Sequence, residues 1–291
     1  MRFAPRTVLH RLITTLVSIA LTVPAQPPQE RRGPESEPIR QGVQLDLEGK
    51  GGEARAVFQR AIDSAPTQAA KANAQRAMAM SWAFEGNCRK TAEYEEKVID
   101  YWKTQEQQAP ATAFYQEGEM ADEAARVCLD HDELNTAYEL YQKGQELGLQ
   151  EPNLPPGRKD LWDYRWEHAQ ARIAARRGNQ AEAEKHVAAA KAILNDLQGK
   201  DPKLYEQQKN FLPSLTGYVA LYTGDAQTAL AELQKANPND ALIQCLIGMA
   251  YEKLGDKAKA MEAYRRAAEV RGHNPPAAFA RPFARKKLGQ S

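Results

Sequence analysis

The chain has 291 residues, of which 42% are hydrophobic and 26% are charged, as in a folded globular protein, and this excludes collagen and wholesale disorder. Its 39 basic and 38 acidic residues nearly cancel, so no strong global charge favours nucleic acid, and we expect no nucleic-acid partner. Aromatic residues make up only 8%, and the frequent alanine, leucine, glutamine and glutamate favour helices over sheets.

Residues 1–25 have the pattern of a secretory signal peptide. Basic residues precede an apolar stretch at 12–23, and Ala25 is a small residue that suits cleavage. The apolar stretch is short for a bilayer span, although an uncleaved signal anchor is the alternative. We therefore expect export to the periplasm or secretion, with no integral membrane segment after cleavage. Residues 26–40 are rich in proline and almost devoid of apolar side chains, which predicts a disordered linker.

From residue 41 the sequence is organised in repeated units. In the last unit, Gly248 precedes a turn at Gly255, and Ala260 and Tyr264 follow on the returning segment. A small residue lets two helices pack closely, and glycine permits the tight reversal between them. Equivalent turns fall at residues 49, 86, 132, 178, 224 and 255. The pattern predicts six helical hairpins, and the repeated spacing of 46 residues predicts long helices or long loops between the middle turns.

This pattern resembles the tetratricopeptide-repeat family, whose unit is a helix-turn-helix of about 34 residues. The resemblance, to exported bacterial-type members, implies an all-α, right-handed α-solenoid of about six hairpins over residues 41–274. The alternative is a generic α-solenoid or an array of helical bundles. Residues 275–291 are expected to form a capping tail, in which Pro282 should break or kink any helix.

Three cysteines, Cys88, Cys128 and Cys245, would enter an oxidising compartment with the exported chain. Their odd number allows at most one internal disulfide, and the absence of a CxxC spacing argues against a zinc site or a redox motif. We interpret them as small, buried helix residues, and the sequence leaves open whether any two of them pair.

No catalytic motif is recognisable in the sequence. It contains no HExxH, P-loop, GxGxxG or GxSxG pattern, and its five histidines are scattered. We therefore expect no enzymatic activity, no cofactor and no metal site. The alternatives are a structural assembly subunit of an envelope complex, or an enzyme whose site is built from distant segments.

The resemblance implies a concave groove lined by the first helix of each hairpin, and there we place the candidate site. The candidate peptide-binding residues are Arg126, Arg165, His168, Arg172, Arg176, Phe211, Tyr218 and Tyr222. Arg126, Arg172 and Tyr218 occupy the same repeat position and should form one row.

A basic ridge beside an aromatic ridge suits an extended peptide with an acidic group or a C-terminal carboxylate. This interpretation requires Arg172 and Tyr218 to be surface residues. The alternative is that the charged side chains form an ordinary solvated face and that the tyrosines pack between the helices. The function predicted from the sequence is therefore a non-enzymatic scaffold or adaptor of the cell envelope that binds a protein or peptide.

Overall fold

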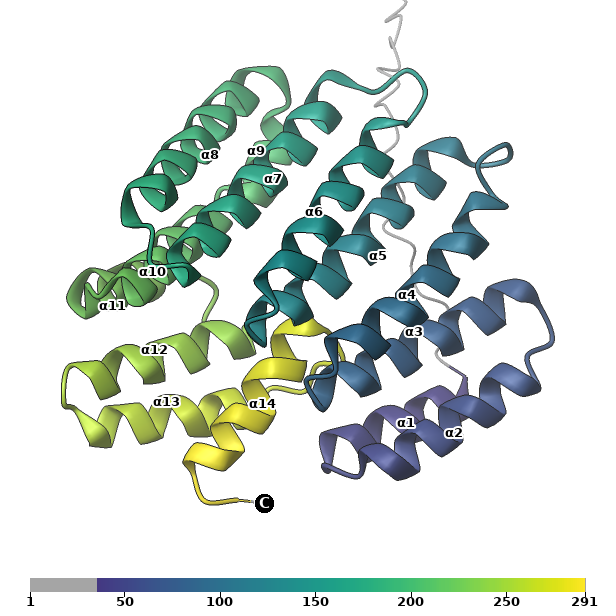
Figure 1. The fold of residues 1–291 in the computed structure, drawn as a ribbon, viewed down its shortest axis with the longest axis horizontal. Coiled ribbons are helices and arrows are strands. Elements are labelled where there is room, and N and C mark those ends of the chain that lie inside the picture. Colours follow the sequence, from purple (N-terminus) through teal and green to yellow (C-terminus); the bar gives the residue numbers. More distant parts are fainter. Residues whose placement is uncertain (1–35, 291) are drawn as a thin grey trace, which may run out of the picture. The chain divides into compact units, whose positions relative to one another are not determined.

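The computed structural model of the chain describes residues 36–290. In this range the chain forms fourteen α-helices and no strand (Figure 1). The helices are α1 (Glu37–Leu47), α2 (Gly51–Asp63), α3 (Gln68–Phe84), α4 (Cys88–Lys103), α5 (Pro110–Asp130), α6 (Leu134–Leu149), α7 (Pro156–Arg176), α8 (Gln180–Lys200), α9 (Pro202–Gln208), α10 (Phe211–Thr223), α11 (Ala226–Leu233), α12 (Ala241–Lys253), α13 (Lys257–Glu269) and α14 (Pro275–Lys287). The signal peptide predicted at 1–25 lies outside the described residues.

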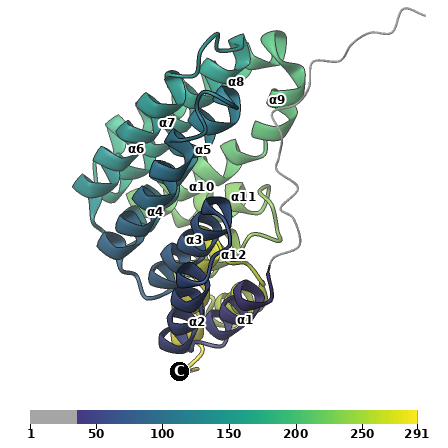
Figure 2. The same ribbon diagram turned by 90° about the vertical axis from the view of Figure 1, so that its right-hand side faces the viewer.

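The helices pair into six antiparallel hairpins, which confirms the expected all-α helical-repeat solenoid. The pairs are α1/α2, α3/α4, α5/α6, α7/α8, α10/α11 and α12/α13, and the two helices of each pair pack on each other. Neighbouring hairpins pack in chain order, so that α3 to α8 run side by side (Figures 1 and 2). The short helix α9 is an addition that the repeat pattern did not predict, inserted between the fourth and fifth hairpins.

All six predicted turns lie where the sequence placed them. Positive φ angles occur at Gly49, Gly86, Asp132, Gly178, Gly224 and Gly255. Asp132, with φ of 64°, adopts the left-handed conformation that glycine supplies at the other five turns. The wide spacing between the middle turns is filled by long helices, since α5, α7 and α8 have 21 residues each.

Small residues lie at the contacts between helices, as the alanine-rich sequence suggested. Ala171, Ala183 and Ala190 are fully buried in the core shared by α7, α8 and α10. At the crossing of α5 and α6, a Cβ on Gly118 would lie 2.7 Å from the Gly144 carbonyl oxygen and would also clash with the Trp162 ring. The close packing of this hairpin therefore requires glycine at residue 118.

The first helix begins inside the segment predicted as a linker. Residues 37–40 are helical, which corrects the linker boundary at residue 40. Pro38 lies in the first turn of α1, where a missing backbone N–H is tolerated. Ile39 and Val43 then pack against the core around Phe58, and this burial holds the first turn in place.

The C-terminal segment forms a buried helix that continues through Pro282, so the expected break at this proline is absent. Helix α14 packs on α12 and α13, as a cap would, but it also packs on α3 and α5 of the second and third hairpins. Arg281 donates a hydrogen bond to the Leu47 carbonyl at 2.9 Å, and His273 Nε2 lies 2.9 Å from the Asp46 carboxylate. The two ends of the solenoid are therefore joined.

Cys88 and Cys128 form a disulfide, with their Cα atoms 4.7 Å apart. It links the start of α4 to the last turn of α5. Both cysteines are buried, as expected, and the structure answers the question of pairing that the sequence left open. Cys245 is free and buried.

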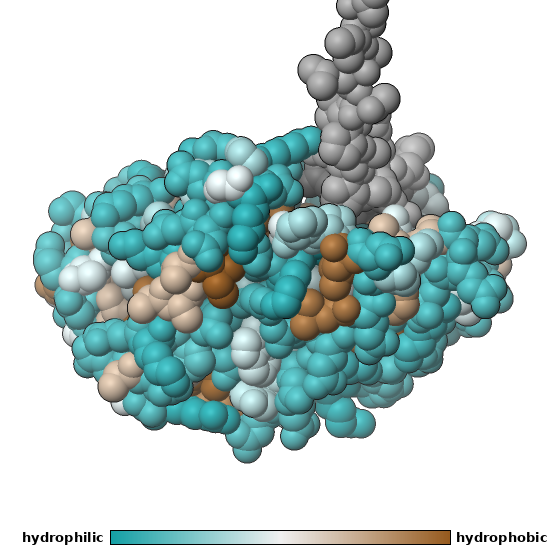
Figure 3. Space-filling model, turned by 90° about the horizontal axis from the view of Figure 1, so that it is seen from above, coloured by the Kyte–Doolittle hydropathy of each residue, from teal (hydrophilic) through white to brown (hydrophobic). Residues whose placement is uncertain are grey.

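The surface seen from above is mostly hydrophilic, with hydrophobic residues in small, separate groups (Figure 3). Among the described residues, Phe211 and Leu254 are the large hydrophobic side chains that are exposed, at 50% and 41%. Within residues 36–290, each helix is either too short or too polar to cross a membrane.

Candidate functional site

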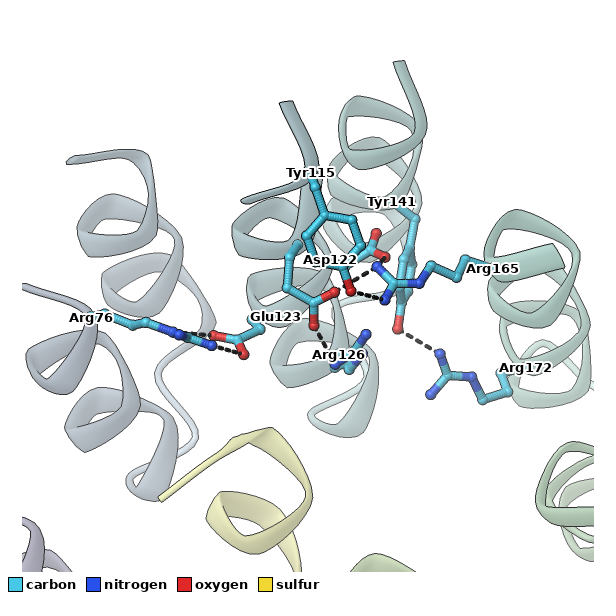
Figure 4. Close-up of polar contacts among 9 residues, drawn as sticks. Arg76, Tyr115, Asp122, Glu123, Arg126, Tyr141, Arg165 and Arg172 are labelled. Atoms are coloured by element: carbon cyan, nitrogen blue, oxygen red, sulfur yellow. Dashed lines mark hydrogen bonds and ion pairs between the residues drawn. The ribbon is translucent and has the colours of Figure 1, made fainter. Parts of the chain in front are cut away.

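The first helices of the third and fourth hairpins bring their charged side chains together. Arg165 on α7 forms an ion pair with Glu119 on α5 at 2.5 Å and lies 3.7 Å from Asp122. Its second amino group donates a hydrogen bond to the Tyr115 hydroxyl at 2.9 Å. Figure 4 shows Arg165, Tyr115 and Asp122 meeting between the two helices. Arg165 is thus fixed by two neighbouring carboxylates and a phenol.

Arg126 is held less tightly than Arg165. Its guanidinium lies 3.5 Å from the Glu119 carboxylate, and 28% of its side chain is exposed. Because Glu119 also pairs with Arg165, one carboxylate serves two guanidinium groups. Arg126 therefore retains hydrogen-bond donors for another group.

Arg172 has no carboxylate partner among the residues that the structure describes. Its guanidinium donates a hydrogen bond to the Tyr141 hydroxyl at 2.7 Å, and its Nε lies 3.4 Å from the His168 carbonyl oxygen. The Tyr218 ring centroid is 6.0 Å from the guanidinium carbon. Arg172 is therefore surrounded by tyrosines and neutral acceptors, and it keeps its charge uncompensated by a direct ion pair.

Arg176 extends this group toward α10. It forms an ion pair with Asp132 and donates hydrogen bonds to the hydroxyls of Tyr218 at 3.2 Å and Tyr222 at 3.3 Å. Its guanidinium also stacks over the Tyr222 ring at 4.6 Å. We name Arg126, Arg165, Arg172 and Arg176, with Glu119, Asp122, Asp130 and Tyr141, the inner cluster.

Tyr218 does not form the accessible aromatic ridge that the sequence suggested. Only 2% of it is exposed, and it belongs to the hydrophobic core with Leu221 and Leu246. Its hydroxyl reaches the inner cluster through Arg176, but its ring is covered by neighbouring helices. The prediction that Tyr218 is a surface residue was therefore wrong, and a substitution of Tyr218 would disturb the core.

The remaining candidate residues flank the inner cluster. His168 is partly buried beside Arg172, and burial, followed by repulsion from Arg172, lowers the pKa of its imidazole well below the ordinary value. This histidine is therefore neutral at pH 7. Phe211, at the first position of α10, is half exposed and provides an accessible aromatic surface.

The carboxyl groups of the inner cluster differ in their ionisation. Burial raises the pKa of Asp122 to about 7 and that of Asp130 to about 6, although nearby arginines oppose both shifts. Burial also acts on Glu119, but Arg165 and Arg126 outweigh it and lower its pKa to about 2. At neutral pH, Asp122 is partly protonated. The arginine charge therefore exceeds the carboxylate charge in the inner cluster.

A second, partly buried ion pair lies between α3 and α5. Arg76 holds Glu123 through two hydrogen bonds, of 3.0 and 2.5 Å (Figure 4). Glu95 on α4 is 1% exposed, and neither of its carboxylate oxygens has a hydrogen-bond partner among the described residues. Burial, reinforced by the nearby Glu123, raises the pKa of Glu95 well above its ordinary value. Sequence reasoning gave Glu95 no role.

Replacing Glu95 with Gln should stabilise the protein, and increasingly so as the pH rises. The folded state holds the Glu95 proton more tightly than the unfolded state does, so the wild type loses stability above the unfolded pKa of about 4.3, until the folded pKa is passed. Between these two pKa values the free energy of unfolding falls by about 1.4 kcal/mol per pH unit. Urea denaturation at pH 4 and pH 8 should show a difference between variant and wild type that is larger at pH 8.

The control is Glu139→Gln, which makes the same substitution at an exposed position of α6. A Glu95→Gln effect of the same size at pH 4 and pH 8 would contradict a buried carboxyl with a raised pKa.

Comparison with known protein families finds a match at the last hairpin. Residues 241–274, which contain α12, α13 and the turn between them, match the family model of the tetratricopeptide repeat. A comparison with curated proteins finds no match. The matched segment is the unit in which the sequence pattern is clearest, and it serves as the template for the other five hairpins.

Proposed function

The chain belongs to the tetratricopeptide-repeat proteins, and from this premise we propose that it is a non-enzymatic scaffold that binds a protein or peptide partner. The binding surface is formed by the partly exposed Arg126 and Arg172 of the inner cluster together with the exposed ring of Phe211. The partner carries an acidic side chain or a C-terminal carboxylate that reaches Arg172 and Arg126.

The free donors of Arg172 are the observation that carries this proposal. Arg172 is bonded to one phenol and one backbone carbonyl, and it pairs with no carboxylate within residues 36–290. A guanidinium binds a carboxylate through two parallel hydrogen bonds, which are stronger than bonds between neutral groups. Since Arg126 shares its carboxylate with Arg165, the two arginines offer donors that an incoming carboxylate satisfies.

We further propose that the protein works outside the cytoplasm, in the periplasm or after secretion. Two features support this location. The N-terminal residues have the composition of a signal peptide, and the Cys88–Cys128 disulfide is of the kind that persists in oxidising compartments.

An assembly subunit of an envelope complex is the second candidate that the sequence left open. Stacking of copies would use the outer faces of the terminal repeats. Helix α14 covers part of the last hairpin and joins it to the first, so less of this surface is free for stacking. The partner-binding function is therefore the better supported of the two.

Replacing Arg172 with Gln should weaken peptide binding by about tenfold to a hundredfold, as expected for the loss of a bidentate carboxylate contact. The ligands would be peptides selected from a random display library on the wild-type protein, each synthesised with a free and an amidated C-terminus. Fluorescence anisotropy would report affinity, and thermal unfolding would report folding. Arg126→Gln should weaken the same peptides.

The matched control is Arg177→Gln, which removes an exposed arginine next to the end of α7. This variant should bind like the wild type. If Arg172→Gln and Arg126→Gln both fold and bind every selected peptide with wild-type affinity, the inner cluster is not the binding surface.

A further inference from the structure

A cleft lies where the two ends of the solenoid meet. It has a volume of about 490 Å³, which is in the range of small-molecule sites. Its walls come from the turn after α1, the start of α2, the end of α3, and α14 with the residues that follow it. We call it the seam cleft. None of its lining residues belongs to the inner cluster.

The wall formed by α14 is basic. Arg281, Arg285 and Lys286 line the cleft from this side. Arg281 donates hydrogen bonds to the carbonyl oxygens of Leu47, Val270 and Ala268, and these neutral acceptors leave its charge uncompensated. Burial lowers the pKa of Arg281, and repulsion from the nearby charges of Arg285 and Arg271 lowers it further. Positive charges therefore lie close together at this wall.

The two acidic residues in the lining already have partners among the neighbouring side chains. Asp46 accepts a hydrogen bond from the Ser81 hydroxyl at 2.8 Å and lies 2.9 Å from His273. Glu85 forms an ion pair with Arg55 at 2.6 Å. Lys286 is exposed and has no ion pair among the described residues. Three basic and two acidic side chains line the cleft, so the lining carries a net positive charge.

Apart from the polar Gln290, the rest of the lining is apolar or without side chains. Phe84, Leu47 and Pro282 contribute apolar surface, and Gly49 and Gly289 leave space at the rim. A Cβ added at Gly49 would meet only Arg285, at 3.6 Å, and one at Gly289 would meet nothing within 4 Å. Pockets that combine apolar walls with a few placed charges select amphipathic small molecules.

We propose that the seam cleft binds a small organic anion that carries a phosphate or carboxylate group on an apolar body. The anionic group lies against Lys286 and the basic face of α14, and the apolar body lies against Phe84 and Pro282. Since the walls come from both ends of the chain's solenoid, the ligand also holds these ends together. The site is separate from the proposed peptide-binding surface, so either proposal can fail without the other.

Phenyl phosphate is the probe for this proposal, and heteronuclear NMR of the full chain is the measurement. We expect saturable shifts confined to residues 46–51, 84–85 and 281–290. Lys286→Gln should weaken binding about tenfold, which corresponds to about 1.4 kcal/mol for one charge-assisted contact. Lys71→Gln, which removes an exposed lysine of α3 away from the cleft, should leave the affinity unchanged.

Three results would overturn the proposal. The first is a shift that stays linear with phenyl phosphate concentration or spreads over the surface. The second is wild-type affinity in Lys286→Gln. The third is equal affinity for inorganic phosphate, since the apolar wall would then contribute nothing.

Discussion

Replacing Arg165 with Met should lower the free energy of unfolding by about 3–5 kcal/mol. Arg165 pairs with Glu119 at 2.5 Å and lies 3.7 Å from Asp122, and both carboxylates are largely buried. Without the guanidinium, these carboxylates lose their main counter-charge inside the fold. Urea denaturation at pH 7 measures the change.

The same substitution should also change the pH dependence of stability. With Arg165 in place, the pKa of Glu119 in the folded protein is lowered to about 2. The ionised Glu119 therefore stabilises the fold above its unfolded pKa, and this stabilisation is lost as the pH falls toward 2. In Arg165→Met, the loss of stability on acidification should be smaller than in the wild type. Arg177→Met, at an exposed arginine beyond the same helix, should cost less than about 0.5 kcal/mol. An equal cost for both variants would show that the buried ion pairs contribute no more than a surface arginine.

Removing the Cys88–Cys128 disulfide should cost about 4 kcal/mol. The bridge closes a loop of 40 residues, and such a cross-link restricts the unfolded chain by about that free energy. The double variant Cys88→Ala/Cys128→Ala should show the loss in urea denaturation, and so should the wild type under reducing conditions. The reductant should have no further effect on the double variant.

Thiol titration of the unfolded, unreduced protein provides the control for this pairing. One free thiol is expected, from Cys245. Cys245→Ala should leave the effect of the reductant on stability unchanged, because this cysteine takes no part in the bridge. Three free thiols in protein purified from an oxidising compartment would contradict the disulfide.

The hairpins could be predicted from the sequence because each is encoded locally. A turn needs one residue with positive φ, and a small residue must lie where the two helices touch, so Gly224 and Gly255 identify their turns directly. The turn at Asp132 was found from its flanking residues, with Ala125 before it and Ala137 and Tyr141 after it.

The candidate site could be predicted only in part, because a helical face is wider than the strip that reaches solvent. Arg172 and Tyr218 occupy the same repeat position, but Tyr218 is covered by neighbouring helices while Arg172 reaches the inner cluster. The spacing of residues along one helix cannot show how closely the next hairpin approaches it. The participation of Tyr141 was missed for the same reason, since it lies on the second helix of its hairpin.

The contact between the two ends of the solenoid depends on all six hairpins at once. His273 and Asp46 are 227 residues apart in sequence, and their distance follows from the summed rotations of every repeat between them. No local pattern carries this information. The disulfide is a smaller example, because a separation of 40 residues becomes a contact only once α4 and α5 pack.

Photo-crosslinking in intact cells tests most directly whether the inner surface binds a partner. The crosslinking amino acid p-benzoylphenylalanine would replace Phe211, which is half exposed beside the inner cluster, or Glu139 on the outer helix α6 as the control position. We predict a protein adduct from position 211 that disappears when Arg172→Gln is added, and no such adduct from position 139. An adduct from position 211 that persists in Arg172→Gln, or adducts from position 139 alone, would contradict partner binding through these arginines.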